Sequence, residues 1–268
     1  FFFKSSNILL PIFTTLMVKL INLLFIYIKM PTLKVSEIIK LSPTARAIRF
    51  NKNPFNFKPG QFIILEVDLE KTKKFKVKNK PKIQKRAYSI SSSPKNKKYL
   101  EITVRTTDDP FVSDYLVNYL QKNEQLKVTG PFGNFYFNEN KSNKNIVMIG
   151  AGSGICPLVA ILRYIQGKKL NFNICLLDSN RRKNEILWKK DLEKLPKNIT
   201  CEFTLTRENP KSWKGNLGRI NKEMIQKNIK NIKKTDFYIC GPPTLVKDTE
   251  KILLELNTPK KNIKKEMY

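Results

Sequence analysis

The chain has 268 residues, enough for one large domain or two ordinary ones, and its 41% apolar and 27% charged residues suit a folded core. It has no histidine, which excludes a Ser-His-Asp triad and histidine-bound zinc or haem, and its four cysteines form no Cys-x-x-Cys pair, so we expect no metal site. Lysine and arginine number 51 against 22 acidic residues, a formal charge of +29.

The first segment of the chain, residues 1–29, is an apolar leader. The run from Ile8 to Ile28 is about long enough to cross a bilayer as a helix, although Lys19 interrupts it. Two other interpretations stay open, a spurious extension ahead of a translation start at Met30 and a signal peptide. The few, unpatterned cysteines suit a reducing compartment. We therefore expect a cytoplasmic protein, with a membrane-anchored protein facing the cytoplasm as the alternative.

The segment 30–140 is expected to form a small antiparallel barrel. From Leu33 to about Phe137 the apolar period is mostly two, and clusters of Pro, Gly, Asn and Lys separate the runs. One helix is predicted over Ser113–Leu120, and Lys71–Lys85 is predicted to be a basic loop. Many short strands with turn signals between them are typical of a barrel. The predicted strands are Lys34–Ile39, Ala45–Phe50, Phe62–Leu69, Ala87–Ile90, Leu100–Arg105 and Gln125–Thr129.

The pattern changes at Asn145, after a polar linker that begins at Asn138. Strands then alternate with helices, which predicts a parallel sheet in a Rossmann-like dinucleotide-binding domain over 145–268. The predicted strands are Ile146–Ile149, Phe172–Leu177, Ile199–Leu205 and Asp236–Cys240. Of the predicted helices, one follows the first strand and ends near Gln166, and the others span Asn184–Leu195 and Pro243–Leu256.

A glycine-rich turn joins the first of these strands to its helix. It reads Gly150-Ala-Gly152-Ser-Gly154-Ile-Cys-Pro157. Glycines let a pyrophosphate approach the backbone closely, and a helix N-terminus offers free N–H groups and the positive end of a dipole. A tight structural turn is the alternative, but a strand before it and a helix after it favour phosphate binding.

Two segments of the predicted barrel carry further candidates. Arg86 and Tyr88 share one face of a strand, where a guanidinium suits phosphate and a flat ring suits stacking, and Ser89 follows them. Judged by spacing alone, this pair is better interpreted as a surface arginine and a core tyrosine than as a ligand-binding pair. Val112 and Ser113 enter the predicted helix, where Ser113 is a suitable N-cap and the helix end could hold a second pyrophosphate. Capping alone explains Ser113 equally well.

The last candidates lie near the C-terminus. Cys240-Gly241-Pro242-Pro243 stands at the carboxyl end of the last predicted strand, where open α/β sheets bind ligands. A small, polarizable thiol suits contact with a nicotinamide, and a buried structural cysteine is the equal alternative. Glu266 and Tyr268 end the chain and carry no signal by themselves.

Taken together, these residues resemble the ferredoxin–NADP reductase superfamily, which also contains the NADH–cytochrome b5 reductases and the reductase components of oxygenases. The resemblance runs from about Met30 to Tyr268. Six motifs occur in the family's order: Arg86-x-Tyr-Ser, Gly130-Pro-Phe-Gly133, Gly150-x-Gly-x-x-x-x-Pro157, Thr206-Arg207, Cys240-Gly-Pro-Pro243 and Glu266-x-Tyr268. The resemblance implies an FAD-binding barrel followed by an NAD(P)-binding domain.

For the flavin, the resemblance implies a set of roles in the first domain. Arg86 would bind the flavin pyrophosphate, Tyr88 would line the isoalloxazine ring, and Ser89 would lie near flavin N5, where hydride arrives. Val112 and Ser113 would help to hold the FAD phosphates. The family usually has a glycine shortly before that serine, whereas this chain has Asp108-Asp-Pro110-Phe, so the local contact could differ.

For the coenzyme, NADPH or NADH, the resemblance implies roles in the second domain and at the chain end. Glu266 would join the catalytic cluster, and Tyr268 would cover the flavin and yield to the nicotinamide. Cys240 would sit by the nicotinamide. The phosphate turn and the coenzyme-binding motifs would comprise Gly150, Gly152, Gly154, Pro157, Thr206, Arg207, Gly241 and Pro242.

The choice between the two coenzymes stays open at this point. Asp178 could accept a hydrogen bond from a ribose hydroxyl, which favours NADH. Arg181, Arg182 and Arg207 could pair with a 2′-phosphate, which favours NADPH.

We therefore predict a flavin-dependent reductase that passes hydride from NAD(P)H to FAD and electrons to a separate carrier such as ferredoxin, flavodoxin or a cytochrome. An electron-transfer subunit of a larger redox complex is the alternative. The charge of +29 suits an acidic protein carrier, although AT-rich coding bias explains much of it, because the lysines are scattered. A nucleic-acid-binding protein is not expected, since the aromatic residues lie in apolar strands and motifs rather than among basic patches.

Overall fold

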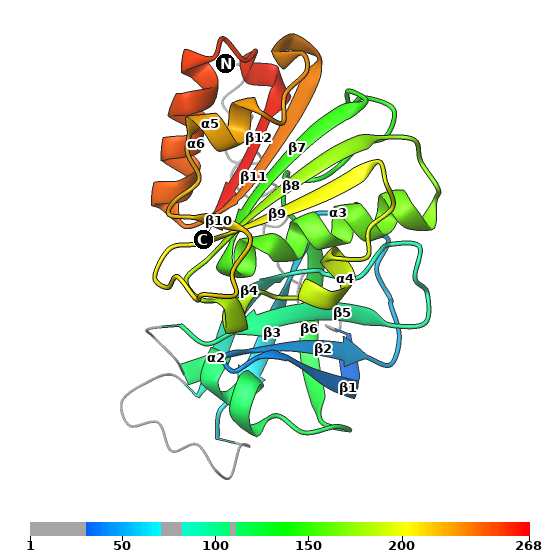
Figure 1. Ribbon diagram of the computed structural model, residues 1–268. Coiled ribbons are helices and arrows are strands. Elements are labelled where there is room, and N and C mark those ends of the chain that lie inside the picture. The colour runs from blue at the N-terminus through cyan, green and yellow to red at the C-terminus, as the bar shows by residue number, and fades with distance from the viewer. Residues whose placement is uncertain (1–30, 71–81, 108–110) are drawn as a thin grey trace, which may run out of the picture. The chain divides into compact units, whose positions relative to one another are not determined.

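The structure, a computed structural model, describes residues 31–70, 82–107 and 111–268. The described residues from Thr32 onward cluster into one compact unit that contains two sheets (Figure 1). The predictions for the leader at 1–29, for most of the basic loop and for Asp108–Pro110 lie outside the described residues. No helix of the described residues is both long enough and apolar enough to cross a membrane.

The first sheet is antiparallel and closes into the expected barrel. Its strands stand in the order β4-β3-β6-β1-β2-β5, and an isolated bridge between Ile90 and Ile102 joins the two ends of that order. The six strands are β1 (Thr32–Ser42), β2 (Ala45–Phe50), β3 (Phe62–Asp68), β4 (Ile83–Ser89), β5 (Leu100–Arg105) and β6 (Gln125–Phe132). β4 begins at Ile83, so the sequence placed the start of this strand four residues too late.

The barrel core follows from the period of two. In β3, Ile63, Leu65 and Val67 are buried and alternate with partly exposed residues. β5 differs, because Leu100 through Val104 are all buried. Its apolar residues face the barrel core, so the polar residues between them must be covered from the other side.

The predicted helix at Ser113–Leu120 takes a different form. It is a short α-helix, α2 (Phe111–Asp114), that continues as a π-helical segment over Tyr115–Tyr119. Ser113 is helical, so the prediction that it caps the helix N-terminus is wrong. The side chain of Val112 packs in the barrel core and is 2% exposed.

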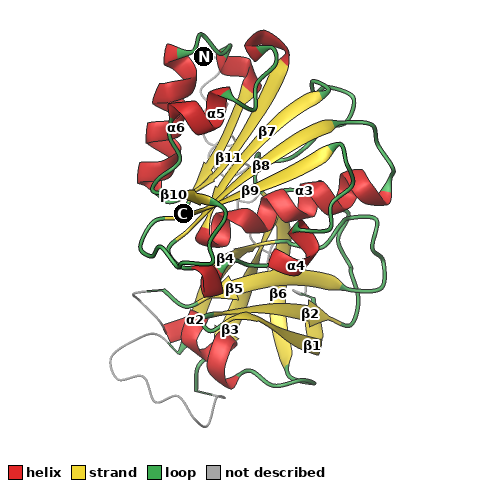
Figure 2. Ribbon diagram, in the orientation of Figure 1, coloured by secondary structure: helices red, strands yellow, loops and turns green. Residues whose placement is uncertain are grey.

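The second sheet is parallel, as expected (Figure 2). Its strands stand in the order β10-β9-β8-β7-β11-β12. They are β7 (Asn145–Ala151), β8 (Asn173–Asn180), β9 (Ile199–Leu205), β10 (Asn216–Leu217), β11 (Thr235–Gly241) and β12 (Ile263–Met267). The strand order reverses direction beside β7, which is where doubly wound sheets bind ligands.

Helices cover both faces of this sheet. α3 (Ile155–Gly167) and α4 (Lys189–Leu192) pack on one face, against Met148 and its even-numbered neighbours in β7. α5 (Lys222–Gln226) and α6 (Pro243–Glu255) pack on the other, against Val147 and Ile149. The near-continuous apolar run of β7 therefore contributes side chains to the hydrophobic cores on both faces of the sheet.

Two parts of the sequence prediction need correction here. The helix predicted over Asn184–Leu195 is only a 3-10 turn at Lys183–Glu185 and the single turn α4, because Trp188 has a left-handed backbone with φ of +50° that interrupts the helix. The strand β12 was missed, because its sequence Ile-Lys-Lys-Glu-Met has too few apolar residues to show a strand pattern.

Candidate active site

Register between neighbouring strands brings three of the predicted residues into one row. Cys240 on β11 pairs with Gly150 on β7 on one side and with Glu266 on β12 on the other. Strands lie about 4.8 Å apart, so the carboxyl ends of these three strands converge on a small area. The missed strand β12 is thus the element that carries Glu266 and Tyr268 into the site.

The glycine turn lies at the end of this row. Gly152 has a left-handed φ of +57°, and Gly152–Gly154 form a 3-10 turn that leads into α3. A Cβ on Gly154 would lie 2.1 Å from the carbonyl oxygen of Cys240, so the turn packs directly on β11. Pro157 lies in the first turn of α3, where a missing N–H costs no helical hydrogen bond.

A cavity of about 550 Å³, here called the arginine cavity, opens beside the glycine turn. Arg181, Arg207 and Arg219 line it, and none of them forms an ion pair within the described part of the chain. Asp248 is the one acidic residue among its lining residues. Of the predicted coenzyme residues, Gly152, Thr206, Arg207, Pro242 and Tyr268 line this cavity.

Asp178, the candidate ribose ligand, does not line the cavity. It is 1% exposed and accepts a hydrogen bond from the Asn180 side-chain amide at 2.8 Å, and its Oδ1 has no hydrogen-bond partner in the described part of the chain. Burial raises the pKa of Asp178 to about 7. The structure thus places this carboxyl beneath the cavity wall, and the interpretation that it selects NADH loses its support.

A second cavity of about 550 Å³, here called the barrel cavity, lies between the end of β4 and the C-terminus. Six predicted residues line it: Arg86, Tyr88, Ser89, Ser113, Glu266 and Tyr268. Burial raises the pKa of Tyr88 above its ordinary value, so its hydroxyl stays protonated and can donate a hydrogen bond. Phe62 and Met267 add apolar surface.

Glu266 and Cys240 differ in their access to this cavity. Glu266 lines the cavity, is half-buried, and has a pKa raised to about 7 by burial. Cys240 is 1% exposed and lines neither cavity. Burial raises the pKa of the Cys240 thiol well above its ordinary value, so it stays a neutral thiol and not a thiolate nucleophile.

Tyr268 lies where the two cavities adjoin. Its hydroxyl accepts a hydrogen bond from the Gly154 N–H at 3.1 Å and donates to the Ala151 carbonyl at 2.6 Å. The residue as a whole is 58% exposed and lines both cavities. The Gly154 N–H, a donor in the turn that was predicted to hold a phosphate, is therefore hydrogen-bonded to Tyr268 instead.

Some predicted residues line neither cavity, and some lining residues were missed. The predicted residues that line neither cavity are Val112, Gly150, Gly154, Pro157, Cys240 and Gly241. Arg105, Thr107 and Ser153 line both cavities, as Tyr268 does, and were not predicted. Arg105 was detectable, since it ends a strand in which Glu101, Thr103 and Arg105 repeat with a period of two.

The comparisons with known proteins agree with this architecture. An oxidoreductase FAD-binding domain model matches residues 32–137, and an oxidoreductase NAD-binding domain model matches residues 148–251. The chain thus contains an oxidoreductase FAD-binding domain followed by an oxidoreductase NAD-binding domain, the order that the resemblance to the ferredoxin–NADP reductase superfamily implies. It is an oxidoreductase that binds FAD and a nicotinamide coenzyme.

Several curated proteins are similar over most of this chain. The glycine betaine monooxygenase reductase subunit of Chromohalobacter salexigens is 28% identical over 206 residues, which cover 74% of this chain and 52% of that protein. NADH-cytochrome b5 reductase 2 of Aspergillus fumigatus is 28% identical, with 80% and 67% covered. Sulfhydrogenase 1 subunit gamma of Pyrococcus furiosus is 26% identical, with 86% and 76% covered. The chain spans about half the length of the glycine betaine monooxygenase reductase subunits that it matches.

Solved structures share the fold. The cytochrome b5 reductase domain of Ulva prolifera nitrate reductase has a TM-score of 0.76 at 20% identity, with 89% of this chain and 97% of that chain covered. A ferredoxin NADP+ reductase from Neisseria gonorrhoeae with bound FAD and NADP has a TM-score of 0.72 at 22% identity, with 88% and 98% covered.

The residues of the barrel cavity fit a flavin, and those of the arginine cavity fit a nucleotide. A volume of about 550 Å³ with apolar walls and a few convergent polar groups is typical of a cofactor site. At the glycine turn, the left-handed φ of Gly152 and the close contact of Gly154 with β11 disfavour side chains at these two positions, so the backbone is open to a phosphate. Arg86, Tyr88 and Ser89 would hold the flavin, and the turn would hold the coenzyme pyrophosphate.

Proposed function

We propose that this protein transfers electrons from NADPH, through FAD, to a separate acidic protein carrier such as a ferredoxin, a flavodoxin or a cytochrome. The observation that carries the proposal is the contact between the two cavities. Arg105, Thr107, Ser153 and Tyr268 line both, so the cavities adjoin, and ligands bound in them would meet when Tyr268 moves aside. When bound, FAD supplies a ring that accepts hydride at N5 and passes electrons on singly or in pairs.

The residues of this chain then have distinct tasks. The turn N–H groups and the N-terminus of α3 would hold the coenzyme pyrophosphate, and Arg86 would hold that of the flavin. Ser89 offers a hydroxyl donor inside the barrel cavity, and so does the Glu266 carboxyl in its protonated form, which the raised pKa favours. Tyr268 closes the boundary and must leave the Gly154 N–H before that donor can bind a ligand.

Three arginines that form no ion pair with any described residue support NADPH as the preferred coenzyme. Arg181, Arg207 and Arg219 line one cavity that has a single acidic residue, and a guanidinium pairs well with a phosphate. NADPH carries a 2′-phosphate that NADH lacks. The buried position of Asp178 removes the competing contact to a ribose hydroxyl.

The formal charge of +29 supports an acidic partner. If opposite charge steers the encounter, turnover with an acidic carrier should fall by about tenfold between about 0.01 and 0.15 M ionic strength. Turnover with a small neutral dye, measured in the same buffers, should change by less than twofold. Equal salt dependence for both acceptors would contradict the acidic carrier.

A second candidate function is that of an electron-transfer subunit in a larger redox complex. It is supported by the similarity to the sulfhydrogenase gamma subunit, which extends over 86% of this chain. Size-exclusion chromatography of the native protein separates the two candidates, since a subunit would elute with its complex. A cytoplasmic location is also proposed, supported by the four free cysteines.

A further inference from the structure

The face of β5 that points away from the barrel core carries a row of polar residues. Glu101, Thr103 and Arg105 alternate with core residues, and each contacts a residue outside the barrel. Glu101 pairs with Arg163 of α3, and Arg105 pairs with Glu185, just before α4. Thr103 lines the barrel cavity beside Cys156 of α3. This single strand face therefore joins the barrel to the nucleotide-binding half.

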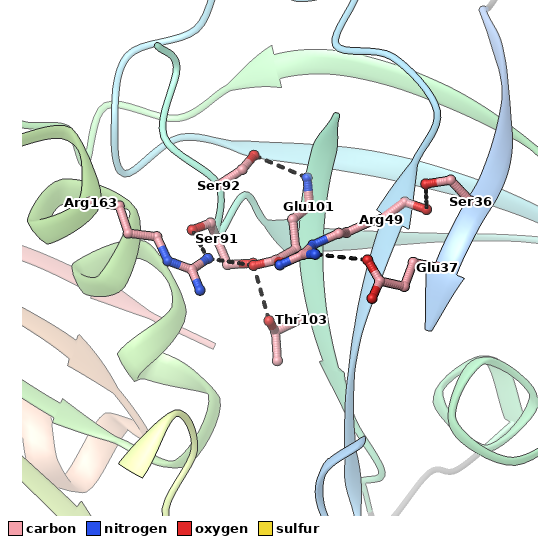
Figure 3. Close-up of polar contacts among 8 residues, drawn as sticks. All are labelled: Ser36, Glu37, Arg49, Ser91, Ser92, Glu101, Thr103 and Arg163. Atoms are coloured by element: carbon pink, nitrogen blue, oxygen red, sulfur yellow. Dashed lines mark hydrogen bonds and ion pairs between the residues drawn. The ribbon is translucent and has the colours of Figure 1, made fainter. Parts of the chain in front are cut away.

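Glu101 is the most buried member of this row. Its side chain is 1% exposed and lies between two guanidinium groups, Arg49 of β2 and Arg163 of α3 (Figure 3). Arg49 Nε donates to Glu101 Oε2 at 2.8 Å, and the Ser91 hydroxyl donates to Oε1 at 2.9 Å. A buried carboxylate is stable only when its oxygens are paired in this way.

The charge of Glu101 is maintained by its neighbours. Burial raises the pKa of this carboxyl, but Arg163, Arg49 and Ser91 lower it by more, so the pKa lies below its ordinary value. The group is therefore ionised across the neutral range.

Ser91 connects this carboxylate to the flavin side of the site. Ser91 stands two residues after Ser89, and its N–H donates to the Glu101 carbonyl at 2.8 Å. The Thr103 hydroxyl donates to Ser91 Oγ at 3.2 Å, and Thr103 lines the barrel cavity. Figure 3 shows Ser91, Glu101 and Thr103 side by side.

Arg163 connects the same carboxylate to the coenzyme side. Its Nη1 donates both to Glu101 Oε1 and to the Ser91 carbonyl, the latter at 2.8 Å. Arg163 lies nine residues after Gly154, which is about 13 Å along the axis of a rigid helix. Holding Arg163 therefore fixes where the glycine turn at the other end of α3 stands relative to Ser89.

We propose that Glu101 is a positioning residue for hydride transfer: through Arg163 and Ser91 it fixes the separation between the coenzyme turn and the flavin-lining end of β4. Hydride transfer requires reacting atoms about 3–3.5 Å apart, and an error of about 1 Å can cost about 100-fold in rate. The carboxylate lines neither cavity, so its effect on the rate passes through α3.

The two arginines that flank Glu101 provide a matched test. Their side chains are 25% and 26% exposed, and each loses one ion pair to the same carboxylate when changed to glutamine. Arg49 belongs to the barrel alone and also pairs with Glu37, whereas Arg163 belongs to α3. A structural role for Glu101 would give both variants the same phenotype.

The experiment uses the full chain with FAD and compares Arg163→Gln, Arg49→Gln and Glu101→Gln. Both arginine variants should lower the melting temperature. Only Arg163→Gln and Glu101→Gln should slow flavin reduction at saturating NADPH, by at least tenfold, while the coenzyme dissociation constant changes less than threefold. Without coenzyme, the same two variants should speed amide hydrogen exchange at 150–157 at least fivefold, and Arg49→Gln should change it less than twofold.

Other results would overturn the proposal. These are an equal loss of rate in both arginine variants, unchanged exchange and rate in Arg163→Gln, or a loss confined to coenzyme affinity. If Arg163→Gln does not fold, Arg163→Lys keeps a positive charge beside Glu101 but loses the planar guanidinium whose Nη1 is held between Glu101 and the Ser91 carbonyl. It should slow flavin reduction at least threefold with unchanged affinity, and an unchanged rate would again overturn the proposal.

Discussion

The two cavities have the same volume of about 550 Å³ but are built in different ways. The arginine cavity is lined by guanidinium groups from the loops that follow β8, β9 and β10, and by the glycine turn. The barrel cavity is lined by the end of β4, by β5 and by β12, so its groups stand on paired strands.

We therefore expect the arginine cavity to determine the affinity for the coenzyme and the barrel cavity to determine the positions of the reacting groups. Charges on loops attract a phosphate over several ångströms and tolerate small displacements. Groups on strands keep their positions to within fractions of an ångström, as a reaction at a ring atom requires. Substitutions on the arginine side should therefore change coenzyme affinity, and substitutions that move strands should change the rate.

The largest effect is expected at the point where the turn packs on β11. Gly154→Ala would place a methyl group 2.1 Å from the Cys240 carbonyl oxygen, so the backbone itself must shift. We expect a loss of about 3 kcal/mol in unfolding free energy, with coenzyme affinity reduced at least about tenfold. Urea unfolding and coenzyme titration measure both.

The matched control for Gly154→Ala is Gly167→Ala. Gly167 is the last residue of the same helix, and a Cβ there would meet nothing within 4 Å. Its unfolding free energy should change by less than about 1 kcal/mol. Similar losses in both variants would contradict the packing explanation.

The next effect concerns stability and pH. Burial raises the pKa of Asp178 to about 7, above its ordinary value of 3.8. As pH rises, the unfolded chain releases this proton at a lower pH than the folded chain does. The wild type therefore loses stability between about pH 4 and pH 7. Asp178→Asn should remove this dependence. The unfolding free energy of the variant minus that of the wild type should therefore be larger at pH 8 than at pH 5, by on the order of 2–3 kcal/mol.

Thermal or urea unfolding at the two pH values checks the Asp178 prediction. Asp191→Asn, which removes an exposed carboxylate on α4, is the control and should shift stability equally at both. A pH-independent difference for Asp178→Asn would show that this carboxyl is ionised throughout the range.

A smaller effect is expected on coenzyme choice. Arg207→Ala removes a charged donor from the arginine cavity and should raise the KM for NADPH about tenfold or more, with the KM for NADH changed less than twofold. Arg182→Ala is the control, because Arg182 is exposed and does not line the cavity. Equal effects on both coenzymes would assign Arg207 to some role other than 2′-phosphate recognition.

The smallest effect is expected from Tyr268→Phe, which removes a hydroxyl at the boundary between the two cavities. Loss of the hydroxyl frees the Gly154 N–H, so coenzyme should bind about threefold more tightly. Tyr136→Phe, at a residue that lines neither cavity, should leave the affinity unchanged. Weaker binding in Tyr268→Phe would mean that the hydroxyl contacts the coenzyme directly.

The sequence predicted most of the fold because both halves have strong local periodicity. The barrel strands alternate cleanly, and β7 with its glycine turn is distinctive. Prediction failed where tertiary context decides. Trp188 adopts a left-handed backbone that no composition rule suggests, and β12 is a strand only because β11 pairs with it.

The candidate site was only partly predictable for a similar reason. Motifs point to residues within one segment, such as Arg86 to Ser89, but not to groups that converge from several segments. Glu101 and Arg163 are 62 positions apart, and nothing in either neighbourhood predicts their ion pair. Such pairs depend on how the two halves meet, which the sequence pattern does not encode.

The most direct test of the central claim is anaerobic flavin reduction. The chain is purified with FAD, mixed with NADPH or NADH in a stopped-flow spectrometer, and followed by the flavin absorbance. We expect the flavin to bleach with both coenzymes, and faster with NADPH at equal low concentration. A protein that binds FAD but keeps its oxidised spectrum with either coenzyme would contradict the transfer of hydride between the two cavities.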